Sequence, residues 1–300
     1  MINRYEGDRN LLAISCINWC GNWGDKAANL EKMKEKTLEA SNMGAAVVVF
    51  PELALSGYEC SDDIHIEQKT CSMHASLAET IPGPSTEEIV RLAEALGVYI
   101  IFGMPEIDIL NKEFVYNSVA LIGPEGLVGR YRKLHLPDLP QFTEKVCFVA
   151  GNELPVFDTS FDRIGIQICM DFAMVPELTR LQSLKGAQII ISPSAIPLSI
   201  SRYSSIPELA ARRGVDNQVY TVVANHTGKE RNVIFAGHST IAGPLPSRPF
   251  NILANAEDAE EIVIATLNMK SLCYFQNKRN IRKKIDWKFI ADEYTKLSML

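Results

Sequence analysis

A carboxylate, an amine and a thiol each stand where a predicted strand ends: Glu52 after one apolar run, Lys133 in a basic segment, and Cys169 after a second apolar run. A free thiol has a pKa of about 8.5, so it is mostly protonated at pH 7 and needs help to react. A carboxylate within hydrogen-bond reach can take the proton as the sulfur attacks, and a lysine favours negative charge on a developing oxyanion. The three residues predict nucleophilic catalysis by Cys169, with Glu52 as general base and Lys133 as electrostatic stabiliser.

Each of these residues also has a plainer interpretation. A lone strand cysteine is usually a buried structural thiol, and a single glutamate or lysine is usually solvated. Glu52, however, is followed by three apolar residues, and burial there would raise its pKa towards the working pH. A cysteine–histidine pair is the other option, but no protease signature surrounds the cysteine. The histidines concerned, which are more simply structural hydrogen-bonding groups, are His135, His226 and His238.

Strands and helices alternate along the chain, which predicts an α/β fold. Apolar runs predict strands at 11–17, 45–50, 98–103, 115–122, 164–169, 188–192, 219–224 and 262–267. Helical periodicity predicts helices at 25–43, 85–97 and 176–185, the second opened by a capping box of Ser85 and Glu88. Continuous apolar runs are typical of strands buried on both faces, and ligands bind at the carboxyl ends of such strands.

Two segments of the chain echo each other. A Gly-Ala pair at 44–45 leads into an apolar strand and Pro51, and a second pair at 186–187 leads into another apolar strand and Pro193. The repetition predicts two similar halves packed face to face.

No linker rich in Pro, Gly or Ser divides the chain, so we expect a single domain over 1–300. Its last part, from about residue 275, is expected to be a C-terminal helix and tail. The basic run 278–284 is most simply a solvated helix face, with a contact to a partner subunit or an anion as the alternative.

The motifs resemble the carbon–nitrogen hydrolase (nitrilase) superfamily, whose members use a Glu–Lys–Cys triad. Glu52, Lys133 and Cys169 match the triad, and Glu144 matches a second glutamate that often follows the lysine. The segments that carry the resemblance are 47–53, 56–58, 129–136, 142–145, 163–171, 176–178, 186–195, 224–228 and 237–239. The resemblance covers roughly residues 10–294 and implies a four-layer α-β-β-α sandwich.

The resemblance implies hydrolysis of a non-peptide C–N bond in a small amide or N-carbamoyl compound, through a cysteine thioester that releases ammonia or an amine. Glu144 is implied to orient the lysine or the substrate amide. Residues 171–175 contain no arginine, which argues against a close match to carbamoyl-amino-acid hydrolases. The Cys-Met-Asp sequence at 169–171 differs from the Cys-Trp-Glu of true nitrilases and favours an amide over a nitrile.

Six residues are predicted to contact the substrate: Tyr58, Met170, Asp171, Phe172, Ser194 and Arg202. Asp171 and Phe172 directly follow the nucleophile, and the backbone N–H of Met170 is the expected second oxyanion donor. Arg202, with Tyr203, is equally consistent with a plain surface loop.

Three other functions stay open. A nitrilase or a thioester-based acyltransferase would use the same nucleophile. A catalytically idle scaffold or regulatory subunit would need no triad, so the intact set of residues argues against it. The predicted chemistry needs no metal and no organic cofactor, and the resemblance alone implies a homodimer or a larger homo-oligomer.

Bulk composition excludes several classes of partner. The formal net charge of −6 argues against binding of nucleic acid or anionic membranes, and no apolar run approaches the roughly 20 residues that span a bilayer. The first nine residues lack the apolar core of a secretory signal, which favours a cytoplasmic protein. The seven cysteines have no framework spacing, and those other than Cys169 are predicted to be reduced, mostly structural thiols. No Cys-x-x-Cys or His-rich tract predicts zinc, and no glycine-rich phosphate motif predicts a nucleotide.

Overall fold

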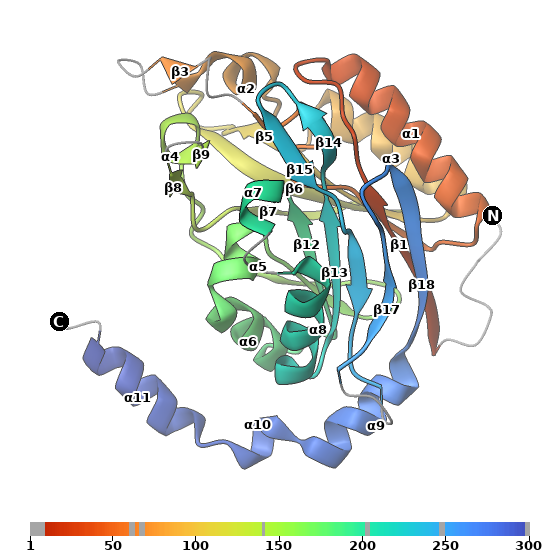
Figure 1. Cartoon of the computed structure of the whole chain (residues 1–300), viewed down its shortest axis with the longest axis vertical. Helices are drawn as coiled ribbons and strands as arrows, with labels where there is room; N and C mark the ends of the chain where they lie inside the picture. The colour runs from red at the N-terminus through yellow and green to blue at the C-terminus, as the bar shows by residue number, and fades with distance from the viewer. Residues whose placement is uncertain are drawn as a thin grey trace.

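The computed structural model of this chain describes residues 10–59, 64–65, 70–139, 142–201, 205–245 and 250–297. Within them, two six-stranded mixed sheets pack face to face, and helices cover the outer face of each sheet (Figure 1). The predicted four-layer α-β-β-α sandwich is confirmed.

The first sheet has the strand order β18-β1-β2-β5-β6-β7. Its strands are β1 (Leu11–Asn18), β2 (Val47–Val49), β5 (Tyr99–Ile107), β6 (Val115–Gly123), β7 (Gly126–Arg132) and β18 (Glu261–Asn268). Strands β1, β2 and β5 run parallel, while β18, β6 and β7 join as antiparallel neighbours. The parallel centre of the sheet brings the carboxyl ends of β1, β2 and β5 to one edge.

The second sheet has the order β10-β11-β12-β13-β16-β17. Its strands are β10 (Val156–Asp158), β11 (Arg163–Ile166), β12 (Ile189–Ser194), β13 (Tyr220–Asn225), β16 (Thr240–Ala242) and β17 (Ile252–Asn255). Strands β11, β12 and β13 are parallel, and the remaining pairings are antiparallel. The second sheet therefore repeats the strand directions of the first, position by position.

The register of the central strands confirms the echo in the sequence. Val47 of β2 pairs with Tyr99 of β5, and Ile189 of β12 pairs with Tyr220 of β13. Val47 and Ile189 hold the same sequence position relative to the glycine of their Gly-Ala pairs, Gly44 and Gly186. The two Gly-Ala segments thus enter equivalent strands of two similar halves.

Alternate side chains of the central strands serve two different cores. Val47 and Val49 face the core between the sheets, whereas Val48 packs under the helices of the first sheet. In the second half, Ile189 joins the core between the sheets and Ile190 packs under the helices on the other side. Burial on both faces explains why these strands are continuous apolar runs.

The helices that cover the sheets are longer than the short helices that lie within the connecting segments. The helices are α1 (Lys26–Asn42), α2 (Ser72–Leu77), α3 (Pro84–Leu96), α4 (Glu144–Cys147), α5 (Met170–Met174), α6 (Pro176–Leu184), α7 (Leu198–Ser201) and α8 (Ile206–Asn217). Helices α1 and α3 cover the first sheet, and α8 covers the second. Three hairpins complete this part: β3 (Ile64–His65) with β4 (Thr70–Cys71), β8 (Asp138–Leu139) with β9 (Phe142–Thr143), and β14 (Thr227–Glu230) with β15 (Val233–Ala236).

The C-terminal part contains three helices where the sequence predicted one. Helices α9 (Met269–Arg279), α10 (Ile281–Lys284) and α11 (Trp287–Leu297) run along the lower edge of the molecule in Figure 1. Asn280 separates the first two because it adopts a left-handed conformation with φ 44°. No helix in the described ranges is long and apolar enough to cross a membrane.

Several predicted element ends differ from those in the structure; β5, for example, runs to Ile107, four residues beyond its predicted end. Helix α3 begins at Pro84, after Gly83, and the side chain that caps it is Thr86, which accepts the Gly83 N–H. Ser85 instead donates to Glu79 through its N–H and its hydroxyl, so the capping box of Ser85 and Glu88 does not form. Strand β11 ends at Ile166, three residues earlier than predicted, although Gln167 and Cys169 still donate backbone bonds to Ile191 and Pro193.

Candidate active site

Glu52 lies in a tight turn directly after β2. The next residue, Leu53, has a φ of 50°, which is unusual for a residue with a side chain. The neighbouring strand β5 accommodates this turn only because it carries Gly103: a Cβ there would lie 2.2 Å from the Leu53 nitrogen and 2.7 Å from the Glu52 Cα. The turn directs the Glu52 side chain into the interior, where it is fully buried.

Lys133 follows β7 and lies between two carboxylates. Its Nζ donates to Oε1 of Glu52 at 2.6 Å and to Oε1 of Glu144 at 2.6 Å, and Glu144 is the first residue of the one-turn helix α4. Only 1% of Lys133 and 4% of Glu144 are exposed. The structure therefore brings three of the four predicted catalytic residues into one hydrogen-bonded cluster.

Asn117 and Tyr58 complete this cluster. The Asn117 amide donates to Oε1 of Glu52 at 2.7 Å and to Oε2 of Glu144 at 3.2 Å, and the Tyr58 hydroxyl donates to Oε1 of Glu144 at 2.6 Å. The sequence analysis missed Asn117. Its signal was a buried polar residue in the apolar run of β6, where a strand covered on both faces has little use for an amide.

Cys169 stands at a strained corner between β11 and α5. Its φ of 45° and ψ of −96° lie outside the ordinary helix and strand regions, and its backbone N–H is bound to the carbonyl of Pro193 at 3.0 Å. Unlike Glu52 and Lys133, the residue is partly exposed. Strained backbone held by its surroundings is common at active sites, and here it presents the thiol at the strand end.

The charges of the cluster set the protonation states. Burial raises the pKa of Glu52 to about 7, although the adjacent Lys133 ammonium opposes the rise. Burial also works against the charge of Lys133, but Glu144 and Glu52 outweigh it and raise the lysine pKa, so it stays protonated. For Cys169, burial and the Glu52 charge raise the thiol pKa well above its usual value, and Lys133 opposes them. The resting state is therefore a neutral thiol beside a carboxyl group poised near neutral pH.

Residues 11–273 match the carbon–nitrogen hydrolase family, which is most of the chain. The chain belongs to this family. Among its relatives, a protein of Pyrococcus abyssi named nitrilase is 35% identical over 78% of this chain and 81% of its own length. The omega-amidase NIT2 of Bos taurus is 34% identical over 82% of this chain and 85% of its own.

The solved structures agree with this assignment. Nit3 of Saccharomyces cerevisiae, a member of branch 10 of the nitrilase superfamily, superposes with a TM-score of 0.77 at 25% identity, over 92% of this chain and 96% of its own. Family and relatives together make this carbon–nitrogen hydrolase an amidohydrolase, an enzyme that cleaves amide C–N bonds.

In this carbon–nitrogen hydrolase, Asp171 binds the segment that carries Lys133. Its Oδ1 accepts from the backbone N–H of His135 at 2.9 Å and contacts the His135 ring Nδ1 at 2.8 Å. Its Oδ2 accepts from the Tyr131 hydroxyl at 2.7 Å and from the Leu134 N–H at 3.1 Å. Asp171 is fully buried, and its carboxylate links the helix after Cys169 to the chain on both sides of Lys133.

The remaining predicted substrate contacts lie around Cys169. Met170 is half-buried at the start of α5, where helical N–H groups lack intrahelical partners, and Phe172 is buried among apolar residues near α8. Ser194 is buried at the end of β12 and its hydroxyl lies 3.1 Å from that of Ser192. Arg202 lies outside the described residues, and so does Tyr203.

The rings of His226 and His238 each contact a backbone carbonyl. Nε2 of His226 lies 2.6 Å from the Glu52 carbonyl and must donate to it, and burial lowers the His226 pKa, so the ring is neutral. The ring of His238 lies 3.2 Å from the Ala256 carbonyl. The contacts of His226 hold the turn that carries the base, which is a positioning role that the sequence did not reveal.

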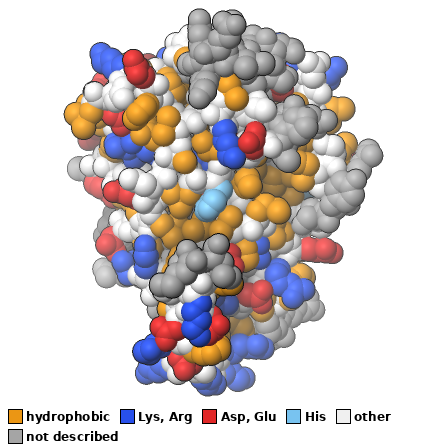
Figure 2. All heavy atoms as spheres, turned by 90° about the vertical axis from the view of Figure 1, so that its left-hand side faces the viewer, with side chains coloured by type: hydrophobic (Ala, Val, Ile, Leu, Met, Phe, Trp, Pro, Cys, Tyr) orange, Lys and Arg blue, Asp and Glu red, His pale blue; other side chains and the backbone are white. Residues whose placement is uncertain are grey.

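Figure 2 shows the left-hand side of the molecule in Figure 1, on which α4 lies. Hydrophobic side chains gather in the middle of this face around a histidine, with charged side chains towards the margins.

Proposed function

We propose that this amidohydrolase cleaves a small linear amide or N-carbamoyl compound through a thioester on Cys169, with Glu52 as the proton carrier. The observation that supports the proposal best is the state of Glu52. Its Oε1 is bound by Lys133 and Asn117, whereas its buried Oε2 has no hydrogen-bond partner among the described residues. A buried carboxylate oxygen without a hydrogen-bond partner costs free energy. A role in accepting the thiol proton would explain why Oε2 is left free to bind a proton.

In the first half-reaction, the Cys169 sulfur forms a bond to the carbonyl carbon as its proton passes to Glu52. The tetrahedral intermediate then loses its C–N bond, and Glu52 returns the proton to the departing nitrogen. Because the thiol pKa is raised, the resting enzyme holds no stable thiolate, and proton transfer accompanies the attack. The products of this half are a thioester and ammonia or an amine.

In the second half-reaction, a water molecule gives one proton to Glu52 and attacks the thioester carbon. The C–S bond breaks, the sulfur regains the proton, and the carboxylic acid leaves. Glu52 begins and ends each half in the same state, so one base with a pKa near 7 serves both halves.

Lys133 is proposed to stabilise the oxyanion in both halves. An ammonium has three N–H donors, and two of those on Lys133 are bound to Glu52 and Glu144. The third is available for the substrate oxygen, and the N–H of Met170 is proposed as the second donor. Glu144 and Tyr58 act as positioning residues, because they fix the direction in which the ammonium points.

The substrate class is proposed from the site and from the relatives. Buried carboxylates around the reaction centre favour an uncharged reacting group such as an amide. Several relatives are named omega-amidases, which favours an amide at the end of a short carbon chain, and others are named nitrilases. We place the enzyme in the cytoplasm because its described cysteines are free thiols. We propose a homo-oligomer on the basis of its family resemblance alone.

A screen for ammonia release tests this proposal across terminal amides, carbamoyl amines, carbamoyl amino acids and nitriles. We expect turnover of one or more amides, an acyl mass on the peptide that contains Cys169 after acid quenching, and a hydroxamate when hydroxylamine competes with water. Turnover of nitriles without amides would replace the substrate class. Turnover without any acyl adduct or hydroxamate would overturn the covalent mechanism.

A further inference from the structure

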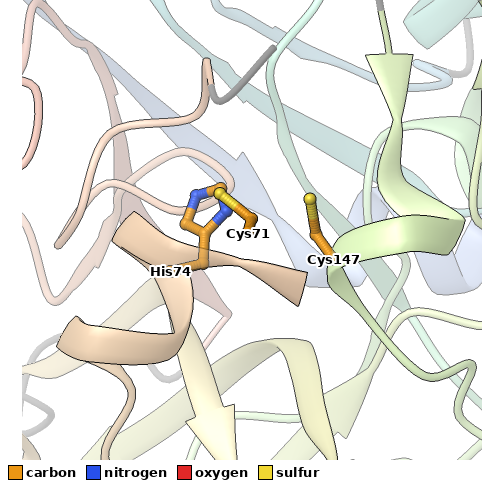
Figure 3. A group of neighbouring side chains, drawn as sticks. All are labelled: Cys71, His74 and Cys147. Atoms are coloured by element: carbon orange, nitrogen blue, oxygen red, sulfur yellow. The ribbon is translucent and has the colours of Figure 1, made fainter. Parts of the chain in front are cut away.

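A second group of reactive side chains lies near the helix that begins at Glu144. It consists of Cys71 at the end of β4, His74 in α2 and Cys147 at the end of α4 (Figure 3). One ligand atom from each residue lies within 4.8 Å of the other two, and all three residues are buried. Cys71 and His74 are separated by two residues, whereas Cys147 comes from a distant part of the chain.

We propose that Cys71, His74 and Cys147 form a binding site for a thiophilic divalent cation, with Zn²⁺ as the expected ion. Two thiolates and one imidazole are ligands that zinc favours, with bonds of about 2.3 Å to sulfur and about 2.0 Å to nitrogen. Ligand atoms around a tetrahedral ion at those bond lengths lie slightly less than about 4 Å apart. The three ligand atoms, now within 4.8 Å of one another, therefore need to move only a little closer together to bind the ion.

His74 carries the strongest indication of a ligand. Its Nε2 lies 3.1 Å from the carbonyl of Gly57, so this nitrogen must be the N–H donor. The same bond fixes the tautomer and leaves Nδ1 as the bare acceptor. Nδ1 is buried and has no hydrogen-bond partner in the described part of the chain, although only 1% of His74 is exposed. A metal-binding histidine commonly donates its other ring N–H to a backbone carbonyl in this way.

The surroundings suit a cation neutralised by two thiolates. The cysteines belong to an apolar cluster that includes Met73, Phe148 and Leu136, and the His74 ring packs on Phe148 with centroids 4.9 Å apart. An unpaired charge would be expensive in such a place, but one Zn²⁺ and two thiolates are neutral together. A disulfide between the two cysteines would leave the His74 nitrogen without a partner, so a metal explains the third residue as well.

The site is connected to the active site through α4. This helix is a single turn that begins at Glu144 and ends at Cys147, and its closing bond runs from the Phe148 N–H to the Glu144 carbonyl at 2.8 Å. On the other side, His74 holds the carbonyl of Gly57, and the next residue, Tyr58, donates to Glu144. A bound ion would therefore tie together two segments that position Glu144.

Metal analysis of the full chain tests the site without any reference to turnover. The test uses protein that carries Cys169→Ala, so that the active-site thiol cannot bind the ion, and reducing conditions throughout. We expect one equivalent of Zn²⁺ by elemental analysis after dialysis, and a rise in the midpoint temperature of unfolding on adding Zn²⁺ to the metal-free protein. Co²⁺ in its place should give the thiolate charge-transfer band and the visible bands of a tetrahedral site.

Variants locate the ion. Cys147→Ser and His74→Gln should each lose the bound equivalent and the charge-transfer intensity, whereas Cys273→Ser, at an exposed cysteine of α9, should keep both. Because the cobalt spectrum is recorded on protein with all three ligands intact, a variant that fails to fold does not block the test. No stoichiometric metal in folded protein, or metal retained by both variants, would overturn the proposal. A Cys71–Cys147 disulfide found by peptide mapping of protein kept in reductant would also overturn it.

Discussion

The ends of β2 and β12 occupy equivalent places in the two halves, yet only one of them carries charge. Both strands enter through a glycine with positive φ, Gly44 at 96° and Gly186 at 105°, and both continue into a proline. Counting on from the paired strand residues, Glu52 at the end of β2 corresponds to Ser194 at the end of β12. The Glu52 side chain bonds to an ammonium and an amide, whereas the Ser194 hydroxyl, within the described residues, bonds to Ser192.

The difference shows what a buried charge requires from a symmetric fold. A hydroxyl is satisfied by one neighbour, but a buried carboxylate needs a counter-ion and further donors. The first half supplies them from β6 and from the segment after β7, which carry Asn117 and Lys133. The fold places two equivalent strand ends, and side chains from the antiparallel part of one sheet decide which end becomes reactive.

The strands next to β2 and β12, which are β5 and β13, also differ at the position that faces these ends. Gly103 in β5 corresponds to Ala224 in β13, because Tyr99 and Tyr220 hold equivalent places. The Glu52 turn presses against Gly103 too closely to admit a Cβ, whereas the equivalent position in the second half holds a methyl group. The turn that buries the base is thus packed more tightly than its counterpart.

Replacing the nucleophile should have the largest effect. Cys169→Ala is expected to lose kcat on the order of 10⁶-fold, as removal of a covalent nucleophile does elsewhere, while the circular dichroism spectrum stays unchanged. Cys169→Ser should be nearly as inactive because a hydroxyl is much harder to ionise than a thiol. A correctly folded alanine variant with near wild-type ammonia release would remove Cys169 from the mechanism.

The two strand ends can be compared directly by mutation. Glu52→Gln should lower kcat by roughly 10²- to 10⁴-fold, the usual contribution of a positioned general base. It should also slow alkylation of Cys169 at neutral pH. Ser194→Ala removes only contacts to one neighbour, Ser192, so we expect a loss of less than about tenfold. Equal losses of kcat from the two variants would show that the two strand ends are functionally alike and that the Glu52 charge confers no special role.

The raised pKa of Glu52 predicts the pH dependence. Below its pKa of about 7 the carboxyl group is protonated and cannot accept the thiol proton, so kcat/KM should fall about tenfold per pH unit on the acid side. In the native state this group keeps its proton to a higher pH than the ordinary value of 4.5, so folding is favoured more at low pH. Its contribution to the free energy of unfolding should therefore decline as the pH rises from 4.5 to about 7.

Glu52→Gln is the control for the pH dependence of both reactivity and stability. The variant should lose the acid limb of Cys169 alkylation and the corresponding decline in stability, measured by urea unfolding at several pH values. An acid limb that persists near pH 7 in the variant would assign it to another group.

Packing around the Glu52 turn should give the smallest effect. Gly103→Ala forces a Cβ against the Leu53 nitrogen and is expected to lower the free energy of unfolding by about 1–3 kcal/mol, with a lower kcat from the displaced base. The reciprocal change, Ala224→Gly, should cost no more than about 1 kcal/mol and leave kcat close to wild type. Urea unfolding and steady-state rates check both, and equal kcat values for the two variants would contradict the packing argument.

The sequence predicted the parts of the site that depend on local motifs. Glu52 and Lys133 each follow a predicted strand, Glu144 was predicted from the family resemblance alone, and the structure joins the three by hydrogen bonds. Two equivalent halves were also predictable, since the Gly-Ala segments mark the same strand in each.

The parts that it missed depend on contacts between distant segments. Asn117 reaches Glu52 across 65 positions and His226 reaches its carbonyl across 174, and neither residue has a motif of its own. Asp171 was predicted to face the substrate because it follows the nucleophile, but the bonds described for it all run to residues 131–135. A helix start depends on fine geometry as well, which is why Thr86 rather than Ser85 caps α3.

The grouping of one ammonium with two carboxylates also governs how the reaction ends. In the proposed mechanism, the acid released from the thioester becomes an anion close to Glu52, Glu144 and Lys133. Once Glu52 has given up its proton, negative groups outnumber positive ones, and the product is repelled from the place where it formed. We expect this repulsion to speed the release of the product, so inhibition by product acids should weaken as the pH rises through 7. Inhibition constants for a small carboxylic acid, measured between pH 6 and 8, would show no such trend if release were independent of these charges.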